Sequence, residues 1–495
     1  MSKLTDLDAT EIARRVGKGE ISISEVCSAF QDRAADLNEG INAVVTFNDD
    51  ALTQAKAADD RLAAGAPARP LEGVPFVVKD NIPTAGLRTT FGSLVHETNV
   101  PKESAIVVER LQAAGGILMG KTNTSEFATD VNTTNRIFGL TRNPLDPFVS
   151  AGGSSGGTAA AIVSDMAPIG LGTDHGGSIR IPAAWGGISG LRPSPGRVPV
   201  YPAEFAWDTL VAHVQGPLAR TVRDLGLMLS ILAGQDNRDP SSLPDPDADY
   251  IVAARDGSPL RGRKIALCMD LGGVMPVDPE VAEAVRAAAA TFTQQGAIVE
   301  EACFDASDIR DIIAGTRSFG VIGRFSELLE EHAPKLTKQL VNQIEGAASQ
   351  SLASVARAER LRSAYWRRVR NFLERYEFIL TPTIGALPFR IDQPLPNHIG
   401  GVEVENYYDV FLGVYAFSLV GLPAISVPCG VSKSGLPIGL QIVGHRLRDD
   451  KVLAAAASYA RIRPQHFKRR PIRRPEGRLG YEVDTPGTRT AALSD

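Results

Sequence analysis

Apolar residues in the first seventy positions recur at helical spacing on either side of one short β-like run. Between residues 26 and 37, a valine, a phenylalanine, an alanine and a leucine are separated by four, four and three positions, which predicts an amphipathic helix. Residues 41–47 have the character of a strand, and residues 50–64 predict a polar, alanine-rich helix. The N-terminal part of the chain is therefore expected to be mainly helical.

From residue 71 onward, short apolar runs alternate with helical stretches. Residues 107–114 and 279–294 predict single helices, and residues 308–375 predict a long, charged helical region. This alternation indicates an α/β fold with a large central mixed, mostly parallel sheet covered by helices on both faces. The predicted strands are residues 74–78, 117–119, 169–171, 264–267, 378–380, 424–427 and 438–443.

The pattern divides the chain into three parts. Residues 1–70 form a helical segment packed on the core, residues 71–460 a large α/β domain, and residues 461–495 a basic, proline-rich tail. Residues 235–262 are polar and rich in aspartate and proline, which is typical of a surface connection. We expect the tail to be solvated rather than to bind nucleic acid.

Composition narrows the class of protein. Of 495 residues, 43% are hydrophobic and 22% are charged, which is typical of a globular chain. The formal net charge of −5 argues against a general binder of polyanions, and no apolar run is long enough for a transmembrane helix. The N-terminus turns acidic too early for a signal peptide. We therefore expect a cytoplasmic protein with neither a nucleic-acid nor a membrane partner.

The four cysteines lie far apart and form no CxxC pair. Their spacing suggests neither a zinc ribbon nor a disulfide framework, and a reducing compartment is the default interpretation. They are Cys27, Cys268, Cys303 and Cys429.

Three segments combine glycine, serine and one lysine in patterns that favour chemistry. In residues 73–81, Lys79 ends an apolar strand, where a lysine either extends to solvent or is buried and functional. Residues 151–158 are rich in glycine and serine but lack the lysine of a phosphate loop. They formally match the GxSxG nucleophile motif, although a loop rather than a strand is expected before them.

The third segment, residues 172–182, contains two adjacent glycines that are followed by Ser178. Glycines allow successive backbone N–H groups to point into one concavity. A serine at the end of such a turn can attack a carbonyl carbon while the N–H groups bind the developing oxyanion.

Together and in this order, the three segments resemble the amidase signature family. The resemblance continues through residues 120–123, 139–144, 190–194, 422–428 and 435–441, and covers roughly residues 20–450. It implies a Ser-Ser-Lys triad in which Ser178 is the nucleophile, Ser154 the bridging serine, held by a cis peptide in the family, and Lys79 the base. It also implies an oxyanion hole formed by the backbone of His175, Gly176 and Gly177 together with Ser178, and supporting roles for Ser155, Asp174 and Arg180. His175 departs from the family, which usually has a small or aliphatic residue there.

A lysine can act as a base only if its pKa falls far below the ordinary value of about 10.4, and burial lowers it. Neutral Lys79 could then accept the proton of Ser178 through Ser154 and return it to the leaving nitrogen. We therefore expect an amidohydrolase that cleaves the C–N bond of an acyl or aryl amide through a Ser178 acyl-enzyme.

Two other interpretations remain open. One is the glutaminase (A-type) subunit of a tRNA-dependent amidotransferase, a member of the same family that works with a partner. The other is a serine esterase or hydrolase of another type, such as a Ser-His-Asp enzyme, for which His175 beside Asp174 is the one pairing in a motif.

The expected substrate is a small-molecule amide, and we expect no metal and no cofactor, because the sequence lacks HExxH and any clustered ligand set. A homodimer is the expected assembly on base rates. By the resemblance, residues 131–138, 201–207, 317–325 and 407–417 would build the substrate pockets. Their aromatic residues favour an apolar or aryl group, and they are Phe138, Tyr201, Phe205, Trp207, Phe411 and Tyr415.

Overall fold

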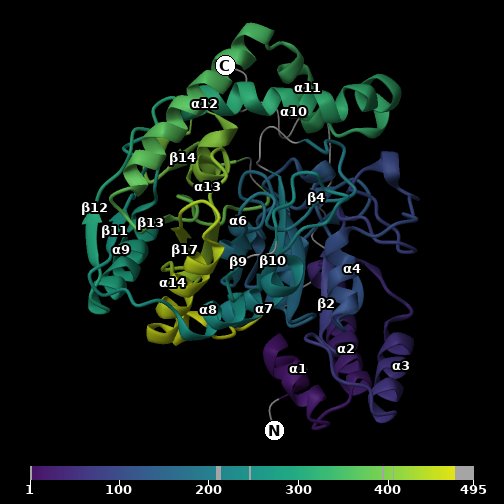
Figure 1. Cartoon of the computed structure of the whole chain (residues 1–495). Helices are drawn as coiled ribbons and strands as arrows, with labels where there is room; N and C mark the ends of the chain where they lie inside the picture. Colours follow the sequence, from purple (N-terminus) through teal and green to yellow (C-terminus); the bar gives the residue numbers. More distant parts are fainter. Residues whose placement is uncertain (1–2, 208–212, 245–246, 393–394, 405, 474–495) are drawn as a thin grey trace.

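A computed structural model describes residues 3–207, 213–244, 247–392, 395–404 and 406–473 (Figure 1). These residues form one large central sheet of eleven strands, which confirms the predicted α/β class. In spatial order its strands are β1 (Val44–Phe47), β3 (Ile117–Thr122), β2 (Pro75–Lys79), β8 (Ile169–Asp174), β10 (Val214–Ala219), β9 (Ser189–Arg192), β16 (Ala424–Val431), β17 (Pro437–Val443), β13 (Phe378–Pro382), β11 (Lys264–Leu267) and β12 (Ile298–Glu301).

Helices account for most of the remaining regular structure. In chain order the α-helices in the described residues are α1 (Ala9–Gly17), α2 (Ile23–Ile41), α3 (Ala51–Ala63), α4 (Ile106–Ala113), α5 (Gly156–Val163), α6 (Arg180–Gly186), α7 (Val222–Leu232), α8 (Tyr250–Asp256), α9 (Pro279–Gln294), α10 (Ile309–His332), α11 (Lys338–Ala348), α12 (Leu352–Leu373), α13 (Leu412–Ser418) and α14 (Asp449–Ile462). Three two-stranded sheets pair β4 (Thr134–Asn135) with β5 (Gly139–Leu140), β6 (Arg142–Asn143) with β7 (Asp146–Ser150), and β14 (His398–Ile399) with β15 (Val402–Glu403).

The central sheet is mixed, as predicted, but parallel pairing is confined to two places. Strands β3, β2 and β8 run parallel to one another, and so do β13, β11 and β12. All other neighbours in the sheet of the described chain pair antiparallel. The sheet is thus less parallel than the alternation of strands and helices suggests, because β16 and β17 form a hairpin and β8, β10 and β9 alternate in direction.

Alternate residues of single strands enter different apolar cores, so both faces of the sheet are covered. On β13, Phe378 and Leu380 pack in the core that contains α9 and α14, whereas Ile379 packs in the core that contains α12 and α13. On β11, Ile265 and Ala266 divide between the same two cores. Helices α10, α11 and α12 lie together at one end of the molecule, far from α1 (Figure 1).

The N-terminal helices are joined to the sheet through β1, which pairs antiparallel with β3. Helix α2 begins with a capping box, in which the Ser22 hydroxyl accepts from the Glu25 N–H and the Glu25 carboxylate accepts from the Ser22 N–H. The predicted strand at residues 41–47 is shorter in the structure, because α2 continues to Ile41 and ends at Asn42 in a left-handed conformation.

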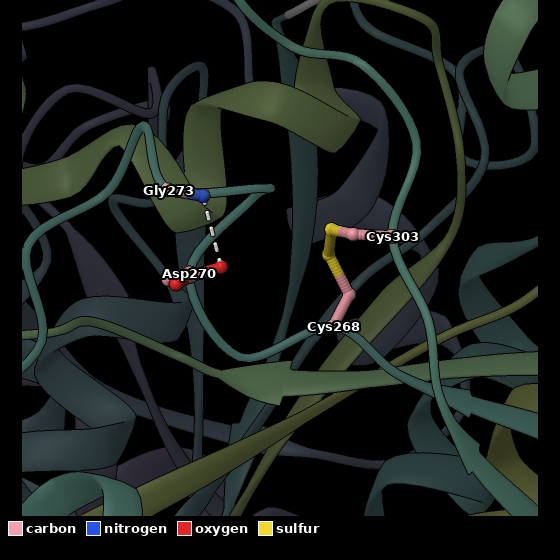
Figure 2. Close-up of a disulfide and its surroundings, with 4 residues drawn as sticks. All are labelled: Cys268, Asp270, Gly273 and Cys303. Atoms are coloured by element: carbon pink, nitrogen blue, oxygen red, sulfur yellow. Dashed lines mark hydrogen bonds between the residues drawn. A yellow bond between two sulfur atoms is a disulfide. The ribbon is translucent and has the colours of Figure 1, made fainter.

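The cysteines differ from expectation, because Cys268 and Cys303 form a disulfide (Figure 2). Cys268 follows β11 and Cys303 lies just after β12, so the bond links the adjacent ends of two parallel strands at the edge of the sheet. Sequence spacing could not indicate this pair, because 35 positions separate the two residues and only the β11–β12 pairing brings them together. Cys27 and Cys429 are free and buried.

Two polar segments are more ordered than their composition suggests. The connection at residues 235–262 contains α8, which packs against α7 and α14. In the basic tail, Arg469 forms an ion pair with Asp165 at 2.9 Å, and the described chain continues to Arg473. The rest of the tail lies outside the described residues. Within the described part of the chain, no helix combines the length and apolar character needed to cross a membrane.

Candidate active site

Lys79 lies at the carboxyl end of β2, beside the parallel strand β8. This pairing places the lysine amine next to residues at the end of β8. Its Nζ lies 2.6 Å from Ser154 Oγ and 2.8 Å from Thr173 Oγ1, and the side chain is fully buried. The structure therefore brings together Lys79 and Ser154, which are 75 positions apart in the sequence.

The surroundings of Lys79 favour its neutral form. Burial lowers the pKa of Lys79 well below its ordinary value, and the charge of Asp174 opposes this shift without cancelling it. The neighbouring Asp80 is directed elsewhere, because its Oδ2 accepts from the Thr90 hydroxyl at 2.5 Å and from the Thr90 N–H at 3.1 Å. A neutral amine can accept a proton from a hydroxyl group, whereas a charged one cannot.

Ser154 and Ser155 precede α5, whose first residues are glycines because neighbouring chain comes very close. A Cβ at Gly157 would collide with the backbone of Asn123. The peptide bond between Gly153 and Ser154 is cis. The Ser155 N–H donates to the carbonyl oxygen of Ser178 at 3.1 Å, which joins the segment before α5 to the segment that carries the predicted nucleophile.

Asp174 is a buried anchor for the turn that carries Ser178. Its carboxylate accepts from the N–H groups of Gly177 at 2.8 Å and Ile179 at 3.2 Å, and from the Arg180 guanidinium at 2.8 and 2.9 Å. Burial alone would raise the pKa of Asp174, but Arg180, Arg192 and the Gly177 N–H outweigh it and hold this pKa well below its usual range. The carboxylate is therefore ionised and neutralised by guanidinium groups.

Of the predicted oxyanion donors, Gly177 is already engaged, because its N–H donates to Asp174. Gly177 has a φ of +114°, and a Cβ there would collide with Val414. Beside it, the His175 ring packs edge to face on Tyr415, with 5.7 Å between ring centroids. Burial, followed by nearby positive charges such as Arg317, lowers the pKa of His175 well below its ordinary value, so the ring is neutral.

A cavity of about 740 Å³ opens in front of this turn. Ser178 and His175 line it, together with Thr173. Five aromatic side chains give much of its wall an apolar character, and they are Phe91, Phe127, Phe205, Trp207 and Phe325. Its size and mixed lining are typical of a small-molecule site.

A family model described as Amidase matches residues 25–453 of the chain. The chain belongs to the amidase signature family. An acylamidase from Rhodococcus erythropolis is 34% identical over 461 residues, covering 92% of this chain and 96% of the relative. The A-type subunit of the glutamyl-tRNA(Gln) amidotransferase from Lachnospira eligens is 34% identical over 492 residues, covering 93% and 99%. The crystal structure of a bacterial aryl acylamidase of this family superposes with a TM-score of 0.86 at 31% identity, covering 94% of this chain and 98% of that one.

This amidase signature chain is an enzyme that hydrolyses amide carbon–nitrogen bonds. Its geometry does not favour the pairing of a Ser-His-Asp enzyme, because Asp174 binds Arg180 and His175 packs on Tyr415. The GxSxG interpretation of residues 152–156 is also not favoured. A strand, β7, does come before that segment, contrary to expectation, but it pairs with β6 outside the central sheet.

Two further residues of this amidase site, Thr173 and Arg192, have no role expected from the sequence. Thr173 lies within the third motif, and its hydroxyl is 2.8 Å from Lys79 Nζ and 3.1 Å from Asn81 Nδ2. Arg192 donates to the carbonyl oxygen of Asp174 at 2.8 Å. In the sequence, the usable signals were the position of Thr173 within the third motif and that of Arg192 within residues 190–194, where the family resemblance continues.

The predicted pocket stretches contribute unequally. Phe205 and Trp207 line the cavity, as the aromatic pattern suggests. Phe138 lies instead beneath the Arg88 guanidinium, and Tyr201 beneath that of Arg238. Phe91, Phe127 and Phe325, which were not among the aromatic residues expected in this pocket, complete its aromatic wall.

Proposed function

We propose that the chain is an acylamidase that cleaves the C–N bond of small aryl or acyl amides through an acyl-enzyme on Ser178. The observation that carries this proposal is the fully buried Lys79 amine, which lies 2.6 Å from the Ser154 hydroxyl and 2.8 Å from the hydroxyl of Thr173, a residue that lines the same cavity as Ser178. A buried, neutral lysine beside a serine is the base of a Ser-Lys variant of the catalytic triad.

In the first step, Ser178 Oγ attacks the amide carbonyl carbon as its proton passes to Ser154, and the proton of Ser154 passes to Lys79 Nζ. The resulting ammonium returns a proton through Ser154 to the leaving nitrogen, so that a neutral amine departs and the acyl group stays on Ser178. Water then attacks the acyl carbon of the ester, and one of its protons passes by way of Lys79 and Ser154 to Ser178 Oγ as the acyl carbon–Oγ bond breaks, so that the acid is released and Ser178 is restored. Protonation of the nitrogen matters because an amine anion is a very poor leaving group.

Backbone N–H groups at His175, Gly176 and Ser178 stabilise the oxyanion in this proposal. Asp174 contributes indirectly: it holds the turn through the N–H groups of Gly177 and Ile179. Preorganised donors of this kind typically contribute about 3 kcal/mol each to transition-state stabilisation.

The preference for an acylamidase rests on the relatives and on the cavity. The Rhodococcus relative is named an acylamidase, and the similar crystal structure is that of an aryl acylamidase. The aromatic wall formed by Phe91, Phe127, Phe205, Trp207 and Phe325 suits an apolar or aryl group better than the small polar side chain of glutamine.

The second candidate is the glutaminase component of a tRNA-dependent amidotransferase. It is favoured by the Lachnospira relative, which has the same 34% identity to this chain as the Rhodococcus acylamidase. The two functions differ in whether the isolated chain is active. An acylamidase hydrolyses an acyl para-nitroanilide alone, whereas the glutaminase component releases ammonia from glutamine only with its partner subunits.

The first experiment is fluorophosphonate labelling of the purified chain, followed by mass mapping of the modified peptide. We expect the label on Ser178, its loss in Lys79→Ala and Ser178→Ala, and turnover of acetyl para-nitroanilide by the unmodified protein. A label on Ser154 would contradict the assigned nucleophile. Ammonia release from glutamine that requires added partner subunits, without anilide turnover, would replace the acylamidase by the second candidate.

A further inference from the structure

One wall of the active-site cavity carries an arginine that has no acidic partner among the residues that the structure describes. Arg317 projects from α10 and lines the cavity together with Ser178. Its Nη2 donates to Gln343 Oε1 at 2.8 Å, and its guanidinium lies 5.9 Å from the centre of the Tyr408 ring. Among the residues that the structure describes, it forms no ion pair with a carboxylate. A neutral amide and an aromatic ring therefore position this charge without neutralising it.

The acidic groups of the cavity wall are already engaged. Glu204 lies 3.2 Å from Arg324, a second arginine of α10. Asp239 accepts from the backbone N–H groups of Val200 and Ser241, each at 2.8 Å. A further arginine, Arg446, is exposed and also lines the cavity. Among the described residues of the lining, three arginines therefore face two carboxylates, although the whole chain has a net charge of −5.

Arg317 lies close enough to the reaction centre to affect it electrostatically. After burial, its charge is the largest cause of the lowered pKa of His175, the residue at the start of the oxyanion turn. The His175 ring packs on Tyr415, whose own pKa is raised by burial and then lowered in part by Arg317. Because Arg317 and Ser178 also line the same cavity, one small ligand within it can contact both.

A guanidinium in a mostly apolar wall has lost part of its hydration and has a planar set of donors to offer. A carboxylate matches this geometry with two parallel hydrogen bonds, and such charge-assisted bonds are about twice as strong as neutral ones. An amide without a negative group would leave the charge of Arg317 unpaired and partly desolvated.

We propose that Arg317 is a specificity-determining residue that selects amides whose acyl or amine part carries a carboxylate or another anionic group. This inference rests on the proposed amidase activity and narrows its substrate class to anionic amides with an apolar or aryl portion. The aromatic wall binds the apolar portion, and Arg317 binds the negative group.

Two matched pairs of substrates test the inference. Glutaryl para-nitroanilide and its neutral analogue pentanoyl para-nitroanilide place the charge on the acyl side, whereas para-acetamidobenzoate and para-acetamidotoluene place it on the amine side. The readout is the ratio of kcat/KM for the anionic and the neutral member of each pair, measured on the wild type, Arg317→Gln, Arg317→Lys and Arg446→Gln.

For one of the two pairs, we expect the wild type to prefer the anionic member. Arg317→Gln should lower that ratio by about 10- to 100-fold, chiefly through a higher KM, because a charged hydrogen-bonded pair contributes that much binding. Arg317→Lys should restore part of the ratio. The control Arg446→Gln, which removes an equal charge from an exposed position, should change the ratio by less than about threefold. This smaller change should shrink further at high salt, because salt screens exposed charges.

Each alternative outcome has a distinct meaning. Turnover of the neutral amides with equal ratios in the wild type and Arg317→Gln would overturn the role of Arg317 and leave the amidase proposal intact. If no amide is turned over, the proposed function fails instead. Calorimetric titration of the Ser178→Ala protein with glutaryl para-nitroanilide and para-acetamidobenzoate then decides the inference. The inference is overturned if neither compound binds, or if the affinity is the same in the Ser178→Ala, Arg317→Gln double variant.

Discussion

Replacing Lys79 by methionine tests the central claim about the site, because methionine fills a similar volume and cannot carry a proton. In the unfolded chain a lysine has a pKa of about 10.4. If Lys79 is neutral in the fold, folding at about pH 8 must remove that proton, which costs about 3 kcal/mol. The methionine variant avoids this cost.

The variant also loses the contacts of Nζ with Ser154 and Thr173, at 2.6 and 2.8 Å. Two such bonds contribute about 1 kcal/mol each, and Thr173 keeps its hydrogen bond from Asn81. Lys79→Met is therefore expected to be as stable as the wild type, or about 1 kcal/mol more stable, at about pH 8. Its amide turnover should fall by at least about 100-fold, because the proposed base is lost.

The pH dependence is the decisive measurement. Below the unfolded pKa and above the lowered folded pKa, the unfolded wild type holds a proton that the folded wild type lacks. Wild-type stability therefore rises with pH in this window, by about 1.4 kcal/mol per pH unit for this group alone. The stability advantage of Lys79→Met should shrink by the same amount per unit, and disappear in the alkaline range.

The assay is chemical denaturation followed by tryptophan fluorescence at several pH values between about 7 and 9. Lys56→Met, which removes an exposed lysine of α3, is the control and should give a curve parallel to the wild type. A parallel curve for Lys79→Met as well would mean that Lys79 stays protonated in the fold. The proton route through Ser154 would then be refuted.

Three further outcomes are expected. Ser154→Ala should slow amide hydrolysis more than hydrolysis of activated esters, whose leaving groups need no proton, and equal losses of kcat/KM would argue against the relay. Asp174→Asn should lower the free energy of unfolding by about 3–5 kcal/mol because it leaves the buried Arg180 and Arg192 uncompensated, and a loss below about 1 kcal/mol in denaturation would contradict this. Thiol titration of the denatured, unreduced chain should detect only Cys27 and Cys429, and four reactive thiols would contradict the disulfide. Reduction of the disulfide should lower the free energy of unfolding by roughly 4 kcal/mol, because the bond closes a loop of the unfolded chain.

Local signals in the sequence were sufficient to predict the elements whose ends are marked by capping residues. Helix α9 has the predicted bounds because Asp278 caps it and Pro279 begins it. Strands β9 and β10 were not predicted, because their short runs contain glycine, proline and glutamine and are buried only by their neighbours in the sheet. Helix α6 escaped detection for a similar reason, since its buried Arg180 does not look like a core residue.

The site divides along the same line. Lys79, Ser154 and Ser178 could be proposed from the sequence because each lies in a compact motif. The charge on Arg317 could not be interpreted, since its meaning depends on Gln343 and on the absence of a carboxylate partner among the described residues. Gly177 was expected to be an oxyanion donor, but in the folded turn its N–H donates to Asp174, which the sequence does not reveal.

Arg180 has a consequence for the order in which the enzyme becomes active during synthesis. Its guanidinium donates to the Val414 carbonyl, Ser418 Oγ and Gln441 Oε1, which lie 234 to 261 positions further along the chain. A ribosome-bound chain that ends within residues 235–262 already contains Lys79, Ser154 and Ser178, but it lacks every one of these acceptors. Ser178, the proposed nucleophile, therefore lacks this support for its turn until nearly the whole polypeptide has been made.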